Sequence, residues 1–139
     1  MLKTINPLLT GELLAILSDM GHGDELVITD ANFPAAAVAQ RLVRLPVSAT
    51  DVVDAVLSVL PLDDFVPAPS AAMDAPDGRP AIYADFEAAM NKAEGREVEL
   101  ELIDRFAFYD RAKSAYAVIA TGERRLYANI ILKKGVLRT

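Results

Sequence analysis

Apolar residues recur along the chain with two different spacings. Near the N-terminus they follow the spacing of one helix face, which predicts an amphipathic helix. Thr10 is a suitable N-cap for this helix, and Gly21 can end it in the left-handed conformation. The apolar positions are Leu9, Leu13, Leu14 and Leu17.

Further helices and strands alternate along the rest of the chain. The run 26–28 is apolar throughout, which is typical of a strand buried on both faces, whereas glutamates alternate with apolar residues over 97–102. A short connection separates the last two strands, which predicts an antiparallel hairpin. Helices are predicted over 50–60, 83–94 (ended by Gly95) and 106–114. Strands are predicted over 26–28, 41–45, 98–102, 115–120 and 126–132.

This alternation predicts a three-layer α/β/α fold with a mixed, mostly parallel central sheet. A length of 139 residues favours one domain over residues 1–139. Five of the eight prolines fall between positions 61 and 80, so this stretch is interpreted as a loop-bearing segment.

Composition excludes several classes of function. The absence of cysteine excludes disulfides and a thiolate nucleophile, and a single histidine argues against a zinc site. A net charge of −6 disfavours nucleic acid as a partner. No apolar run reaches membrane-spanning length, and Gly11 and Glu12 interrupt the apolar N-terminus, so a cytoplasmic protein is expected. The hydrophobic fraction of 53% fits either a well-filled core or a large oligomer interface.

Charge is unevenly distributed along the chain. From Arg105 onward, eight basic residues stand against two acidic ones, while the preceding part is strongly acidic. We expect the two parts to neutralise each other in the fold, and the alternative is a basic patch for an anionic ligand.

His22 is the main candidate for acid–base chemistry. It lies between Gly21 and Gly23 and follows the first predicted helix. An imidazole titrates near neutral pH, so it can exchange protons with a substrate. The alternative is a histidine that interacts favourably with the C-terminus of that helix.

Polar side chains in three other segments are candidates for ligand binding. Asp30 follows the predicted buried strand, where ligands gather in α/β sheets, although it could instead stabilise a turn. Arg105 and Tyr109 have helical i, i+4 spacing, which would place both side chains on one face toward a ligand. The alternative is an aromatic core helix whose arginine is solvated. Tyr127 and Asn129 share a face if their segment is a strand, and that face could also be a polar outer surface.

Several ordered segments resemble the L-fucose mutarotase / D-ribose pyranase family, and most closely its fucose branch. The central residues 47–102 match weakly. At position 128 this chain has alanine, as pyranases do, where the fucose branch usually has glycine. At the Arg105 segment it resembles the fucose branch, because pyranases tend to carry histidine there. The resembling segments are MLKTI (1–5), MGHGDE (20–25), TDANFP (29–34), RFAFY (105–109), TGER (121–124) and ILKKGV (131–136).

The resemblance implies a mutarotase that needs no cofactor or metal and interconverts the α and β anomers of a monosaccharide, with L-fucose favoured. It implies that His22 acts as an acid or base and that the protein forms a ring-shaped homo-oligomer, often a decamer. The implied sugar contacts are Asp30, Arg105, Tyr127, Ala128 and Asn129. Alternatives are a D-ribose pyranase, a non-catalytic sugar-binding or transport accessory protein, and a structural oligomer-forming domain.

The expected strand places His22 and Asp30 far apart. Fully extended, residues 24–30 span about 20 Å, so the two side chains could not reach one sugar. Either the glycine-containing loop folds back or a neighbouring subunit completes each site.

Overall fold

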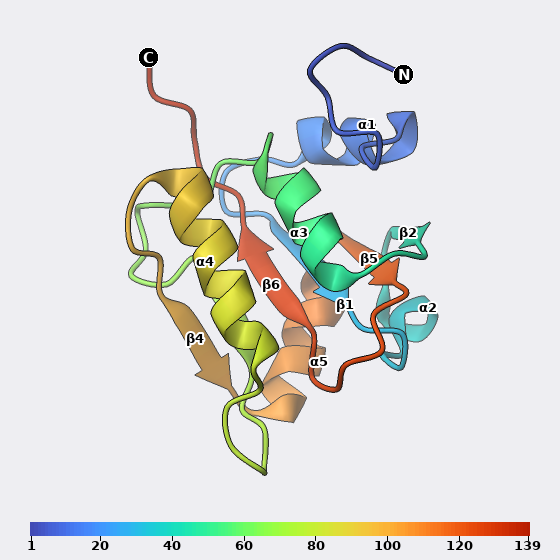
Figure 1. Cartoon of the computed structure of the whole chain (residues 1–139), viewed down its shortest axis with the longest axis vertical. Helices are drawn as coiled ribbons and strands as arrows, with labels where there is room; N and C mark the ends of the chain where they lie inside the picture. Colours follow the sequence, from blue (N-terminus) through green and yellow to red (C-terminus); the bar gives the residue numbers. More distant parts are fainter.

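The computed structural model describes residues 1–139 and contains one six-stranded sheet (Figure 1). The strand order is β2-β5-β1-β6-β3-β4. β6 runs antiparallel to β1 and β3, and the remaining neighbours are parallel, which confirms the mixed, mostly parallel sheet. The strands are β1 (Glu25–Thr29), β2 (Leu42–Leu45), β3 (Ser70–Met73), β4 (Leu100–Ile103), β5 (Ala117–Thr121) and β6 (Ile130–Lys133).

Helices cover both faces of this sheet, which confirms the three-layer prediction (Figure 1). On one face, α1 (Gly11–Asp19), α3 (Ala49–Leu57) and α4 (Ile82–Glu94) pack against alternate strand residues such as Leu26 and Ile28. On the other face, α2 (Ala35–Val38) and α5 (Arg105–Ser114) cover Val27 and Ile131. β1 is therefore buried on both faces, as its apolar run predicts.

Two helix ends follow the sequence signals, and one does not. The Thr10 hydroxyl accepts a hydrogen bond from the Leu13 N–H at 3.3 Å, and Gly95 ends α4 with a φ of 67°. The prediction for Gly21 is wrong, because α1 ends before it and its N–H donates to the Asp24 carboxylate at 2.7 Å. The left-handed residue of this turn is Gly23, with a φ of 88°.

The predicted hairpin is also wrong. β5 and β6 do not pair, because β1 lies between them and forms hydrogen bonds with both. The strand predicted over 126–132 begins only at Ile130, and residues 122–129 form the loop that crosses β1. The stretch between the prolines at 61 and 80 also contains an unpredicted strand, β3, which is completely buried.

Gly135 lies where the chain passes very close to another segment. Its N–H donates to the Pro61 carbonyl at 2.8 Å. A Cβ at Gly135 would lie 2.5 Å from the Leu62 carbonyl oxygen and 2.7 Å from the Asp63 Cα. Both atoms belong to the backbone and cannot move aside cheaply, so this position requires glycine.

We predict that Gly135→Ala lowers the free energy of unfolding by about 1–3 kcal/mol through overpacking. Gly11→Ala is the matched control, because a Cβ at Gly11 meets no atom within 4 Å. Urea unfolding followed by circular dichroism measures both effects. Equal midpoints for the Gly135 variant and the native protein would contradict the steric argument.

Candidate active site

Four of the predicted binding residues meet at the carboxyl end of the parallel strands. Asp30 follows β1, Arg105 begins α5, and Tyr127 and Asn129 precede β6. Together they line a cavity of about 200 Å³. Segments about 75 to 100 positions after Asp30 thus join it in one concave surface, where ligands bind in sheets of this kind.

Asp30 and Asn129 hold each other in place. The Asp30 N–H donates to Asn129 Oδ1 at 2.7 Å, and Asn129 Nδ2 donates to Asp30 Oδ2 at 3.2 Å. Asp30 Oδ1 also accepts from the Asn32 N–H at 2.9 Å. This contact stabilises a turn, which is the alternative role that the sequence indicates for Asp30. Both side chains are buried, so their orientation is determined before any ligand arrives.

Tyr127 and Asn129 face the cavity for a different reason from the one predicted. They lie in a turn rather than a strand, and Tyr127 has a φ of 60°, which is unfavourable for a tyrosine. Ala128 between them is fully buried on the α3 and α4 side of the sheet, and it does not line the cavity.

The rest of the cavity wall is largely apolar. Of its residues, the sequence indicated only Tyr109 as a candidate for ligand binding. Tyr109 faces the same cavity as Arg105, as their helical spacing predicts. The Phe33 ring lies 5.4 Å from the Tyr109 ring, and Met73 and Leu126 extend this wall. Phe33 directly precedes Pro34 in a motif already noted, but no local pattern indicated its contact with Tyr109.

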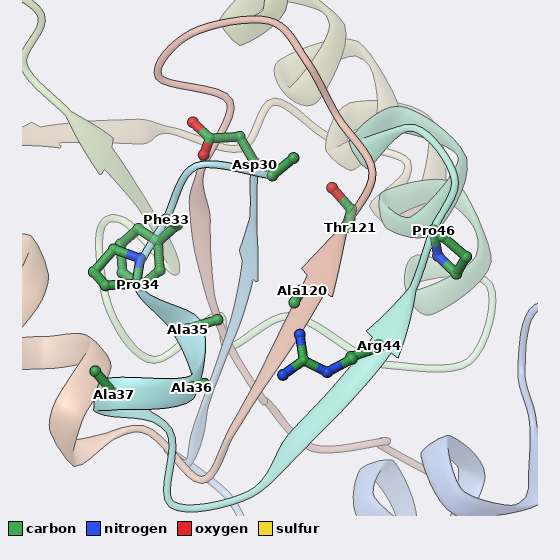
Figure 2. Close-up of a pocket in the computed structure, with 11 residues that line it drawn as sticks. Asp30, Phe33, Pro34, Ala35, Ala36, Ala37, Arg44, Pro46, Ala120 and Thr121 are labelled. Carbon is green, nitrogen blue, oxygen red and sulfur yellow. The ribbon is translucent and has the colours of Figure 1, made fainter.

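A larger hollow of about 460 Å³ lies on the other side of Asp30 and Phe33 (Figure 2). Its lining is mostly alanine and proline, and the Asp30 carboxylate points away from Arg44 on β2 (Figure 2). Since polar groups converge in the smaller cavity, we consider the smaller cavity the better candidate for ligand binding.

His22 lies at the opposite, amino end of the sheet, before β1 begins. Its Nε2 is 3.0 Å from Asp63 Oδ1, and its ring lies 5.0 Å from the Phe65 ring. The imidazole is 43% exposed, and Nε2 is engaged, so Nδ1 is the nitrogen left for another partner. The structure therefore does not bring His22 together with Asp30 in one chain.

Asp63 is a functional candidate that the sequence did not reveal, because nothing local links it to a histidine 41 positions earlier. Burial alone raises the pKa of this carboxyl, but hydrogen bonds from His22 and from the Phe65 N–H outweigh burial and lower it. Asp63 is thus ionised at neutral pH and can orient the imidazole and stabilise its protonated form.

Part of the uneven charge is paired within the fold. Arg111 pairs with Glu25 and Arg138 with Asp64, which links the basic C-terminal part to the acidic part before it, as expected. Arg125 pairs with Glu123 inside the basic part itself. Arg105 forms no ion pair and faces the cavity.

No group of three or more histidine or acidic side chains is placed to hold a metal ion. None of the helices has the length and apolar character that crossing a membrane requires.

The two ends of the sheet offer complementary chemistry. The carboxyl end combines hydrogen-bonding side chains with an apolar, partly aromatic wall, which suits a small polyhydroxylated ring. The amino end holds an exposed imidazole supported by a carboxylate, which suits proton transfer.

Comparisons with known proteins identify the relatives of this chain. The chain is 44% identical over 140 residues to an L-fucose mutarotase of Actinobacillus pleuropneumoniae serotype 5b, covering 98% of this chain and 97% of the relative. The fucose mutarotase of Streptococcus pneumoniae, solved in complex with L-fucose, superposes with a TM-score of 0.91 at 38% identity, covering 99% of this chain and all of that one.

A more distant solved structure is RbsD of Bacillus subtilis complexed with D-ribose. It has a TM-score of 0.74 at 28% identity and covers 99% of this chain and 100% of its own. Residues 3–137 match the profile of the RbsD / FucU transport protein family. The protein therefore belongs to the RbsD / FucU family.

Proposed function

We propose that this protein is an L-fucose mutarotase, an isomerase that interconverts the α and β anomers of the free sugar. The observation that carries the proposal is similarity over nearly the whole chain to fucose mutarotases, one of them solved with L-fucose. The cavity at Asp30, Arg105 and Asn129 supports it, because these side chains can hold the hydroxyls of one small sugar.

L-fucose is favoured over D-ribose as the substrate. Identity is 44% to the L-fucose mutarotase and 38% to the fucose complex, against 28% to the ribose complex. The segment RFAFY (105–109) supports the same choice, because it is one of the segments that resemble the fucose branch, whereas pyranases tend to carry histidine there. Ala128 does not oppose the choice, because its side chain lies outside the cavity.

Anomer exchange requires a proton at the ring oxygen and the loss of a proton from the anomeric hydroxyl. We assign the first step to His22, whose Nδ1 is free to donate while Asp63 holds Nε2. The ring then opens to the aldehyde, which rotates and closes again. Asp30, Arg105, Tyr127 and Asn129 hold the other hydroxyls, and the proton of the anomeric hydroxyl passes to water.

Both sets of residues can act on one sugar only if they come from different subunits. β1 alone separates them by about 13 Å, at roughly 3.3 Å per residue. Exposed apolar side chains flank both sets, with Phe65 beside His22, and Phe106 and Leu126 beside the sugar cavity. We therefore propose that the two ends meet in neighbouring subunits.

Such a head-to-tail contact gives a ring when the rotation between neighbouring subunits closes. The assembly proposed here is a ring-shaped homo-oligomer, with a decamer expected from the family resemblance. We also propose that the protein acts in the cytoplasm. The N-terminal apolar segment supports this location because it forms α1, whose Leu13 and Leu17 are part of the core.

The first test is saturation-transfer NMR between the two anomeric protons of L-fucose. We predict that the native protein accelerates exchange and that His22→Ala reduces the acceleration by about 10²- to 10⁴-fold, the usual contribution of a positioned acid or base. D-ribose in a parallel sample tests the substrate preference. A folded native protein that accelerates neither sugar contradicts the mutarotase proposal and favours a binding protein.

A second prediction concerns Asp63. We expect Asp63→Asn to lower kcat at least about tenfold, because the imidazole loses the charge that orients it and stabilises its protonated form. Asp64→Asn is the control, since this neighbouring carboxylate is paired with Arg138 and not with His22. Equal kcat values for the two variants would remove Asp63 from the mechanism.

A third prediction tests whether each site is shared between subunits. His22→Ala and Asp30→Ala should each be nearly inactive, but subunit exchange between them should restore about a quarter of the native activity, because that share of contacts joins two intact halves. Mixing His22→Ala with His22→Gln should restore none. Failure of the first mixture, with exchange verified by mass spectrometry, would place both halves of the site in one subunit.

A further inference from the structure

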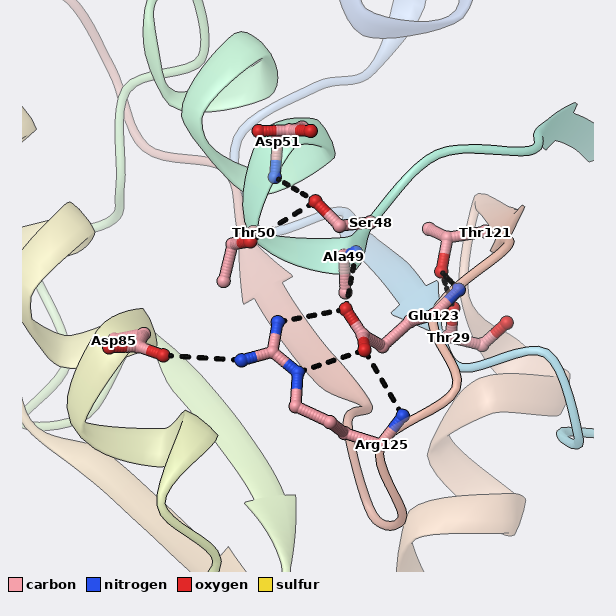
Figure 3. Close-up of polar contacts among 9 residues, drawn as sticks. All are labelled: Thr29, Ser48, Ala49, Thr50, Asp51, Asp85, Thr121, Glu123 and Arg125. Atoms are coloured by element: carbon pink, nitrogen blue, oxygen red, sulfur yellow. Dashed lines mark hydrogen bonds and ion pairs between the residues drawn. The ribbon is translucent and has the colours of Figure 1, made fainter.

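A buried carboxylate outside the sugar cavity ties the cavity's loop to the rest of the fold (Figure 3). Glu123 is only 6% exposed and lies in the crossing loop 122–129, before Tyr127. Its Oε1 accepts from Arg125 Nε at 2.9 Å and from the Arg125 N–H at 3.1 Å. Its Oε2 accepts from Arg125 Nη2 at 2.9 Å and from the Ala49 N–H, at the start of α3, at 3.1 Å.

The backbone of Glu123 reaches the segment that carries Asp30. Its carbonyl accepts from the Ala31 N–H at 2.8 Å. Its own N–H donates to the Thr121 hydroxyl at 3.1 Å, and that hydroxyl donates to the Thr29 carbonyl at 2.6 Å. Glu123 is therefore bonded directly to the residue after Asp30 and to the first turn of α3, and through Thr121 to the residue before Asp30.

The charge of Glu123 persists across the working pH range. Hydrogen bonds from the Arg125 side chain lower its pKa to about 2, against the opposing effect of burial. The pair has a bidentate geometry, which is the strongest and most directional form of this contact. Arg125 also reaches Asp85 on α4 at 3.5 Å, but both of these side chains are half-exposed, so that contact is weak.

The loop needs such an anchor because it contains an unfavourable conformation. Tyr127 has a positive φ, which persists only where surrounding contacts impose it. No strand ladder holds residues 122–129, since β6 begins at Ile130. The residues that this loop supplies to the cavity, Leu126, Tyr127 and Asn129, all follow Arg125 closely in the sequence.

We propose that the Glu123–Arg125 pair is a positioning clamp that sets the sugar cavity by holding the Asp30 segment and the Tyr127–Asn129 turn in register. This proposal rests on the proposed sugar-binding function. Neither Glu123 nor Arg125 lines the cavity or contacts His22, so the clamp acts on binding of L-fucose and leaves the proton donor unchanged.

The test is the dependence of anomer exchange on L-fucose concentration in Glu123→Gln and Arg125→Met. We expect KM to rise about tenfold while kcat stays within about twofold, the pattern produced by losing interactions shared by ground and transition states. Arg125→Lys keeps the positive charge but cannot form the bidentate contact, so it should give an intermediate KM. Asp85→Asn is the control and should leave both constants unchanged.

Hydrogen–deuterium exchange without sugar separates this proposal from the proposed function. In Glu123→Gln and Arg125→Met, peptides covering 30–33 and 122–129 should exchange faster, while peptides from β1 and α4 should not change. Arg125 is half-exposed, so Arg125→Met keeps the test decisive if Glu123→Gln fails to fold.

Two results would overturn the clamp. One is unchanged exchange in residues 30–33 and 122–129, whatever the activity. The other is an unchanged KM together with a uniform loss of protection, which would mean that the pair only stabilises the fold. A native protein without mutarotase activity would instead overturn the proposed function, and the exchange data would still decide whether the clamp orders the cavity.

Discussion

The central strand β1 is the element on which the rest of the structure depends. It is buried on both faces and hydrogen-bonded on both sides, to β5 in parallel and to β6 in antiparallel orientation. Its burial sets the register of both neighbours, because a slip of one residue would exchange the faces of every side chain. Its length also places the turn with His22 at one end of the sheet and Asp30 at the other.

Buried carboxylates organise the polar part of the molecule. Asp30 is bonded to Asn129, Asp63 to His22 and Glu123 to Arg125. A buried charge is costly unless it is paired or hydrogen-bonded, so each of these acids requires a partner in a defined position. For Asp30 and Asp63 that partner is itself a candidate functional residue, so folding and orientation of the site depend on the same contacts.

Elements with a strong local pattern were predicted well, and elements defined by distant partners were not. The helix capped by Thr10 and the one ended by Gly95 follow from capping chemistry that a few neighbouring residues supply. β3 was missed because Ser-Ala-Ala-Met has little strand propensity, and its strand character comes from pairing with β4 and β6. The supposed hairpin failed because a short connection does not reveal that β1 is inserted between the two strands.

The same division holds for the candidate site. The sequence by itself determined the layered α/β fold, the residue types able to bind a sugar, and His22 as the one imidazole, because these depend on local pattern and composition. Only the tertiary structure decided that Asp30 faces Asn129, that Tyr127 lies in a turn, that Asp63 supports His22, and that the two groups lie at opposite ends of the sheet. Those facts depend on strand order and loop paths, which result from packing between segments far apart in the sequence and leave no local signal.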